Sequence, residues 1–217
     1  MTGASEPGAP KPSKPPKPSK HGPRERMVYS AAQLIRRDGV GATGMRDVAT
    51  HAEAPRGSLQ HYFPGGKEQL VNEAVGWAGR YAARQVERFL AALRSGSPQP
   101  RPSELFAAMV GQWTTEFETA GFASGCPVAA VTVDCVDASE SNRTAAAEAF
   151  AVWIRPTAAA LRELGIPEER TTPLATLMIS ALEGALLMAR AEQDIRALAA
   201  VSTELGPLLD GAVSPGL

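Results

Sequence analysis

From Arg24 onward, apolar residues recur at the three- and four-residue spacing of amphipathic helices. Gly39 is placed to end the first of these helices, because glycine readily adopts the left-handed conformation that follows a helix. A second, short helix is predicted from Met45 to Ala52, with Thr43 as its N-cap and Asp47 near its positive end. The apolar stripe of the first helix consists of Met27, Val28, Ala31, Leu34 and Ile35.

A tight turn and a third short helix follow. Pro55 cannot continue the second helix and fits the first turn of the next one, which is predicted from Arg56 to Phe63. Leu59 and Phe63 are spaced to point inward together. The outward face of this helix carries Arg56, Ser58, Gln60, His61 and Tyr62.

The rest of the chain is also predicted to be helical, so the fold class is all-α. A long helix is expected from about Lys67 to Leu93, and a linker rich in Ser and Pro follows it. The β-branched stretch Val128–Val136 fits a strand by periodicity alone, but its isolation between helices favours a helix. Further helices are expected near 103–120, 127–138, 140–164, 172–191 and 195–210.

The net charge of −1 conceals an uneven distribution of charge along the chain. Residues 1–70 carry a net charge of +5, and residues 71–217 carry −6, which suggests that one part meets a polyanion and the other does not. Residues 1–23 contain seven Pro and four Lys and are predicted to be a disordered tail. This tail either serves solubility or contacts DNA phosphates as a basic arm.

Several classes of protein are not favoured by the composition. Two Cys and three His predict neither a disulfide scaffold nor a metal site, and no cofactor is expected. The apolar stretch Leu174–Ala189 has 16 residues and contains Glu183, whereas a membrane span needs about 20. Without a visible signal peptide, we expect a soluble, cytoplasmic protein. Because no nucleophile, base and oxyanion donor are assembled, no catalytic residue and no enzyme are predicted.

The two short helices around the turn have the arrangement of a helix-turn-helix, whose second helix enters the major groove of DNA. Its Gln, Arg and Ser side chains suit hydrogen bonding to base edges or phosphates. Lys67, at the start of the long helix, suits a phosphate contact because its charge and the helix N-terminus act together.

Residues 24–82 resemble the DNA-binding domain of the TetR family of bacterial repressors. The likeness rests on Thr43, on Gly57-Ser58-Leu59, and on His61-Tyr62-Phe63 followed by Lys67-Glu68-Gln69-Leu70. The segments FPGGKEQL and GCPVAAV, the latter over 125–131, are similar to the LmrA/YxaF-like branch. Gln60 stands where the family usually has Tyr, and Pro55 where it usually has Ser, which bears on the operator sequence.

The resemblance implies a domain order. An N-terminal three-helix DNA-binding domain over 24–82, with its helix-turn-helix at about 44–63, would precede a C-terminal effector-binding and dimerisation domain over 83–211 and a tail over 212–217. Family members are homodimers that bind a palindromic, double-stranded DNA operator. Residues implied at the DNA are Arg24, Thr43, Arg46, Arg56, Gly57, Ser58, Gln60, His61, Tyr62 and Lys67.

Dimerisation in this family uses the last two long helices, here about Thr172–Ala191 and Ile195–Leu209. The first of these is apolar nearly all round, which is typical of a helix buried on two sides. The alternative is a central core helix of a monomer. The expected dimerisation residues are Leu174, Met178, Ala181, Leu182, Ala185, Leu198 and Leu205.

The family also implies a cavity for a small effector, here expected to be apolar or aromatic. Glu183, alone in an apolar run, is a candidate polar anchor, although a core or interface hydrogen bond would explain it as well. The aromatic candidates could equally be plain core residues. The expected lining is Trp77, Phe106, Met109, Trp113, Phe117, Cys126, Phe150, Trp153 and Glu183.

Two alternatives to an effector-released repressor remain open at this point. Cys126 precedes Pro127 and so lies at a predicted helix N-terminus, where a thiolate is stabilised, and a redox- or electrophile-responsive regulator would use it. A buried structural cysteine is the simpler interpretation. The other alternative is a helical ligand-binding protein without operator recognition.

Overall fold

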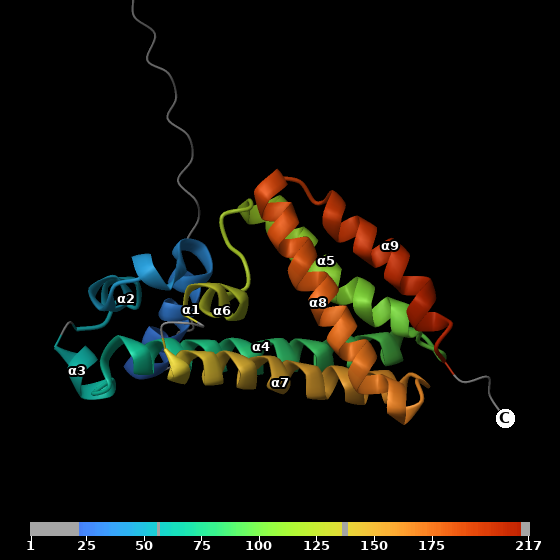
Figure 1. The fold of residues 1–217 in the computed structure, drawn as a ribbon, viewed down its shortest axis with the longest axis horizontal. Helices are drawn as coiled ribbons and strands as arrows, with labels where there is room; N and C mark the ends of the chain where they lie inside the picture. Colours follow the sequence, from blue (N-terminus) through green and yellow to red (C-terminus); the bar gives the residue numbers. More distant parts are fainter. Residues whose placement is uncertain (1–21, 56, 136–138, 214–217) are drawn as a thin grey trace, which may run out of the picture.

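The computed structural model describes residues 22–55, 57–135 and 139–213, and within them every regular element is a helix (Figure 1). The all-α prediction is therefore confirmed. Arg56, most of the predicted N-terminal tail and the last four residues lie outside the described residues. The helices are α1 (Pro23–Ala42), α2 (Met45–His51), α3 (Ser58–Tyr62), α4 (Gly66–Gly96), α5 (Pro102–Ala120), α6 (Pro127–Cys135), α7 (Glu140–Glu163), α8 (Glu168–Glu192) and α9 (Arg196–Asp210).

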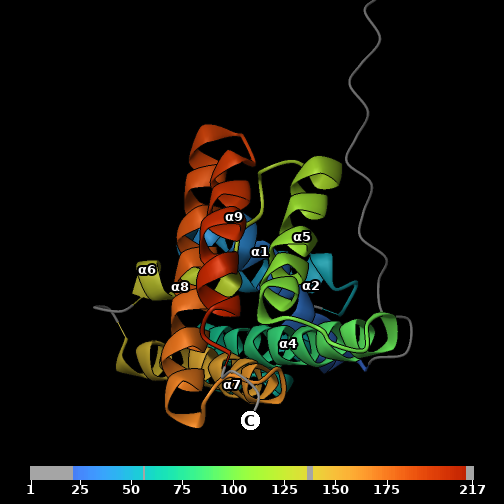
Figure 2. The same cartoon turned by 90° about the vertical axis from the view of Figure 1, so that its right-hand side faces the viewer.

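The helices form two groups joined by α4. Helices α1, α2 and α3 gather at one end of the molecule, and α4 runs from them alongside α7 (Figure 1). Helices α5, α8 and α9 stand across α4 and α7 at the other end (Figure 2). The short α6 packs against α1, α4 and α7, so it connects α1 with the two long helices.

The α4 and α7 backbones approach closely at one point. A Cβ atom added to Gly79 would lie 2.7 Å from the carbonyl oxygen of Ala149, which no real side chain tolerates. Gly79 is therefore required by packing, although glycine within a helix is otherwise unfavourable by about 1 kcal/mol. Its absence of a side chain sets where the two long helices cross.

Gly39 interrupts α1, as its position in the sequence predicts. Its φ of 82° and ψ of 169° are not helical, and a short turn from Val40 to Ala42 continues beyond it. The Val40 backbone N–H, freed by this break, donates a 2.7 Å hydrogen bond to the Asp134 carboxylate of α6. The entry to the helix-turn-helix is thus held by a residue of α6.

Two local predictions are wrong. Gly44, not Thr43, is the N-cap of α2, because the Thr43 hydroxyl instead donates a 2.7 Å hydrogen bond to the Gly39 carbonyl. Pro55 does not lie in the first turn of α3, which begins at Ser58; the Pro55 carbonyl accepts a 3.0 Å hydrogen bond from the Ser58 N–H. The prediction of a helix within Val128–Val136 is confirmed by α6.

Among the described helices, α8 alone has the length and apolar composition that crossing a membrane requires. In the fold it packs against α5, α7 and α9, and ten of its residues are buried. One of them is Glu183, and both of its carboxyl oxygens are buried. These are the features of the central core helix of a helical protein.

Candidate functional site

The short helix α3 presents a polar face to solvent. Leu59 and Phe63 are buried and hold the helix on the core, with Phe63 fully inaccessible. Gln60 and His61 are exposed between them, and Ser58 and Tyr62 are half-buried. This separation of buried and exposed positions leaves Gln60 and His61 free to reach the base edges of a duplex.

Basic side chains surround this helix. Arg24 of α1 lies 5.6 Å from the Phe63 ring and forms a 2.7 Å ion pair with Glu73 of α4. Arg46 is exposed in the first turn of α2 and has no ion-pair partner among the described residues. The Lys67 ammonium lies 3.4 Å from the Gly41 carbonyl oxygen. Thr43, by contrast, is only 5% exposed and can act at the DNA only by shaping the backbone.

A cavity of about 790 Å³ lies between the two groups of helices. Of the residues predicted to line an effector site, Trp77, Met109, Trp113, Cys126 and Trp153 do line it. They come from α4, α5, the start of α6 and α7. Segments far apart in the sequence thus converge on one aromatic wall.

The other four predicted lining residues do not face this cavity. Phe106 and Phe117 are buried in the core, where the Phe117 ring packs 4.9 Å from Phe122. Phe150 is half-buried against the core, and Glu183 is buried beside cavity-lining Leu182. Helical spacing correctly predicted that these residues point into the protein. It does not distinguish residues that face the cavity from residues that pack in the solid core.

Sequence reasoning missed one whole side of the cavity. Tyr29, Gln33, Arg36 and Arg37 of α1 and His51 of α2 also line it, so it is not confined to the C-terminal helices. The Arg36 guanidinium donates hydrogen bonds to the Glu116 carboxylate at 2.5 Å and to the Gly125 carbonyl at 2.8 Å. It also lies 5.2 Å from the centre of the Trp113 ring. The sequence gives no signal for Arg36, because α1 carries several other charged residues.

Glu183 and Cys126 form a buried acidic pair. Burial raises the pKa of Glu183 to about 7, and the neighbouring Cys126 thiol offsets this slightly. Neither carboxyl oxygen of Glu183 has a partner with good hydrogen-bond geometry among the described residues. Burial, together with the nearby Glu183, raises the pKa of the Cys126 thiol well above its usual range, despite the backbone N–H groups of Val128 and Ala129. Cys126 is therefore a thiol rather than a thiolate at neutral pH.

The residues predicted for dimerisation mostly face the protomer's own core. Leu174, Met178, Leu182, Ala185, Leu198 and Leu205 are all at most 9% exposed; Ala181 is half-buried. The buried side chains among them are not available for contacts with a partner chain, because they pack in the core of their own protomer. The large apolar side chains that α8 and α9 do expose are Leu177, Leu187, Met188 and Leu208.

Comparisons with known proteins agree with this architecture. The family model described as "Bacterial regulatory proteins, tetR family" matches residues 29–74, which span α2, α3 and parts of α1 and α4. The model described as "Transcriptional regulator LmrA/YxaF-like, C-terminal domain" matches residues 102–204. An HTH-type transcriptional regulator of Mycobacterium tuberculosis is 42% identical over 193 residues, which cover 87% of this chain and 94% of the relative.

This chain belongs to the TetR family. Its LmrA/YxaF-like branch is shown by the second family model and by the HTH-type transcriptional regulator LmrA of Bacillus subtilis, which is 28% identical over 86% of this chain and 96% of its own length. TetR regulators of known structure share the fold. One from Rhodobacter sphaeroides has a TM-score of 0.72 at 20% identity, covering 84% of this chain and 96% of its own.

Membership of the TetR family fixes the broad activity. The protein is a DNA-binding transcriptional regulator and not an enzyme, because its relatives are regulators of that kind. TetR regulators bind DNA operators, act as dimers and carry ligand-binding C-terminal domains. The helix-turn-helix lies within the first matched segment, and most of the cavity wall lies on α4 and within the second.

Proposed function

We propose that this regulator is a homodimeric repressor that a small effector releases from a palindromic operator. The observation that carries the proposal is the composition of the cavity wall. Helices α1 and α2 form one side, and α4, α5, α7 and α8 form the other. A molecule in this cavity touches the DNA-binding helices and the C-terminal helices at once, so its binding bears directly on their relative position.

At the operator, each protomer places α3 in the major groove. Ser58, Gln60 and His61 contact bases, because amide, hydroxyl and imidazole groups can tell base pairs apart there. Contacts to the DNA backbone fix the position of the helix without selecting sequence. They come from Arg24, Arg46, Arg56, Tyr62, Lys67 and the backbone of Gly57.

The dimer is formed by the exposed faces of α8 and α9. Between Thr172 and Ala191 the exposed residues of α8 carry no charge. Leu187 and Met188 are 53% and 54% exposed there, and Leu208 of α9 is 48% exposed. Large apolar side chains exposed on two neighbouring helices are suited to association with a partner chain. In a two-fold dimer the two α3 helices lie about one DNA turn apart, which suits a palindromic operator. The chromosomal DNA that carries such an operator lies in the cytoplasm, where we place this regulator.

The effector is a small, largely aromatic or apolar molecule. Trp77, Trp113, Trp153 and Met109 supply the apolar wall, and Gln33, Gln85 and Gln112 supply amide groups for orientation. It acts by binding the DNA-free arrangement more tightly than the DNA-bound one, since only differential affinity shifts the balance between states. Arg36 is placed to transmit this difference, because it joins α1 to α5 and to Gly125.

A regulator that senses oxidants through Cys126 is less well supported. A reactive cysteine is accessible and has a lowered pKa, whereas Cys126 is buried and the pKa of its thiol is raised. We therefore assign Cys126 a structural role in the cavity wall.

The first test is selection of binding sites from random duplex DNA with the purified full-length protein. The expected result is an enriched inverted repeat, which is then used to find small aromatic molecules that release it. No enrichment by a folded, dimeric protein would instead favour a ligand-binding protein without operator recognition. An enriched site whose release follows oxidation of Cys126, and is abolished by Cys126→Ser, would contradict the effector mechanism.

A further inference from the structure

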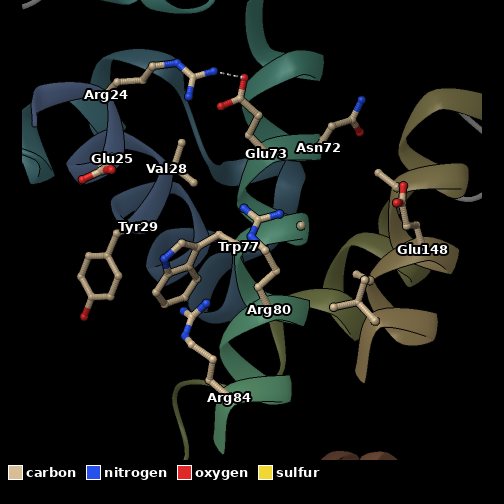
Figure 3. Close-up of a pocket in the computed structure, with 14 residues that line it drawn as sticks. Arg24, Glu25, Val28, Tyr29, Asn72, Glu73, Trp77, Arg80, Arg84 and Glu148 are labelled. Carbon is tan, nitrogen blue, oxygen red and sulfur yellow. Dashed lines mark hydrogen bonds and ion pairs between the residues drawn. The ribbon is translucent and has the colours of Figure 1, made fainter. Parts of the chain in front are cut away.

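A second hollow, of about 980 Å³, opens between α1, α4 and α7 (Figure 3). We call it the α4 groove. It shares only Tyr29 and Trp77 with the 790 Å³ cavity, and its other lining residues are different. Those that matter for its chemistry are Arg24, Glu73, Gly76, Arg80, Arg84 and Glu148.

An ordered aromatic surface forms the middle of the α4 groove. The Trp77 ring stacks on Tyr81, with centroids 5.4 Å apart and an interplanar angle of 14°. It meets the Tyr29 ring edge-on at 5.3 Å and 77°. Contacts with two rings hold the half-buried indole in one orientation, so its surface is available to a ligand without loss of side-chain freedom on binding.

Two arginines of α4 extend over this surface. Arg80 and Arg84 point back along the helix toward Trp77 (Figure 3), as helical side chains lean toward the N-terminus. A Cβ atom at Gly76 would lie 3.2 Å from Nη1 of Arg80, so the glycine leaves the space that this guanidinium occupies. Neither Arg80 nor Arg84 has a carboxylate partner within ion-pair distance among the described residues.

Glu25 of α1, Glu73 of α4 and Glu148 of α7 also line the groove, and none of them forms an ion pair with these two guanidinium groups. Glu73 accepts hydrogen bonds from Arg24 at 2.7 Å and from Gln69 at 2.9 Å, so it is already used. Glu148 stands on α7, across the groove from Trp77 (Figure 3). The α4 wall therefore carries the guanidinium groups of Arg80 and Arg84 beside Trp77, while Glu25 of α1 and Glu148 of α7 border the same space.

We propose that the α4 groove binds a planar aromatic carboxylate, with its ring against Trp77 and its carboxylate on Arg80 and Arg84. The guanidinium fork matches a carboxylate geometrically and forms charge-assisted hydrogen bonds with it. A small monoanion suits the groove better than a polyanion, because Glu148 borders the same space. This site adjoins the 790 Å³ cavity at Tyr29 and Trp77, but its arginines do not line that cavity, and it does not depend on operator recognition.

The test is a calorimetric titration of the full-length protein, without DNA, with 2-naphthoate and with neutral 2-naphthylmethanol. For a ligand of this size a Kd on the order of 1 mM is expected. The neutral alcohol should bind about tenfold more weakly, since it loses the charge-assisted bonds. The double variant Arg80→Gln/Arg84→Gln should weaken naphthoate binding at least about tenfold, while Arg88→Gln, one turn further along α4 and outside the groove, should leave it unchanged.

A third variant separates the two hollows. Trp113 lines the 790 Å³ cavity and not the α4 groove. The affinity of Trp113→Ala for naphthoate should therefore remain within about twofold of the wild-type value. If Trp113→Ala lost naphthoate binding and the arginine double variant kept it, the ligand would lie in the 790 Å³ cavity, and the proposal would be overturned. Equal affinity for the acid and the alcohol, or no binding of the acid, would also overturn it. Since no DNA is present, none of these results depends on the repressor function.

Discussion

The Asp134 carboxylate accepts a 2.7 Å hydrogen bond from the backbone N–H of Val40, ninety-four residues away in the chain. A Cβ atom at the adjacent Gly39 would come within 2.7 Å of the same carboxylate oxygen. Gly39 is thus needed for its positive φ and also for the approach of Asp134. Through this bond α6 holds the last turn of α1, directly before the helix-turn-helix.

Asp134→Ala should lower the free energy of unfolding by about 1 kcal/mol, because the Val40 N–H loses its partner. The melting temperature should fall by about 2–4 °C for a protein of this size. Thermal unfolding followed by circular dichroism measures this. The control is Glu118→Ala, which removes an exposed carboxylate that has no hydrogen-bond or ion-pair partner among the described residues. Equal melting temperatures for both variants would mean that the bond contributes nothing.

The buried Glu183 predicts a dependence of stability on pH. Its pKa is about 7 in the folded state, against 4.5 for a glutamate in the unfolded chain, so the folded protein holds a proton that the unfolded chain releases between these pH values. The contribution of Glu183 to the free energy of unfolding should therefore be greatest below pH 4.5 and should fall as the pH rises toward 7. The loss is up to about 3 kcal/mol.

Glu183→Gln should remove that loss, because the amide does not ionise. Urea unfolding of both proteins at pH 5 and pH 8 measures the effect, and the variant should gain stability relative to wild type at the higher pH. Glu118→Gln, on the exposed face of α5, serves as the control. A constant difference between Glu183→Gln and wild type across this range would show that Glu183 is not held in its neutral form.

Gln60→Ala should change the sequence preference of DNA binding, because Gln60 is exposed on α3 and is assigned to a base. Lys67→Ala should weaken binding to all sequences and reduce the slope of log K against log salt by about one unit. Fluorescence anisotropy with the selected operator and with random duplex, over a series of salt concentrations, tests both. The assignment of roles fails if each variant affects the two DNAs equally.

Leu187→Asp should shift the dimer toward monomer. The side chain is 53% exposed on α8, so the monomer should remain folded while a charge is placed in the apolar partner contact. Sedimentation equilibrium should show at least about a tenfold rise in the dimer dissociation constant. Val133→Asp is the control, since Val133 is a branched apolar residue on α6 that is even more exposed, at 73%. An unchanged dimer in Leu187→Asp would place the interface elsewhere.

Helix positions were predictable from the sequence because apolar periodicity records which face of a helix is buried. The predictions for α2, α5 and α7 differ from the structure by only a few residues. The errors at Thr43 and Pro55 fall where the chain is irregular. There, hydrogen bonds such as that from Thr43 to Gly39 decide the geometry, and they depend on how the backbone already turns.

The candidate sites were less predictable, because they depend on directions that periodicity does not contain. Helix α8 is apolar nearly all round, so its sequence does not say which apolar residues meet the core and which remain for a partner. Leu182 proved to be buried and Leu187 exposed. The cavity likewise includes Arg36 and His51, whose place in its wall follows only from how α1 and α2 pack on the C-terminal helices.

The close contact of Gly79 with Ala149 is a point about which α4 can tilt, and it lies about two-fifths of the way along the helix. Gly66, at the DNA end of α4, lies about 20 Å from this point at 1.5 Å per residue. A tilt of about 5° at Gly79 would displace that end by about 2 Å. In a two-fold dimer the displacements add, so two α3 helices set for half-sites about 34 Å apart would miss their grooves after a rotation too small to disturb the core.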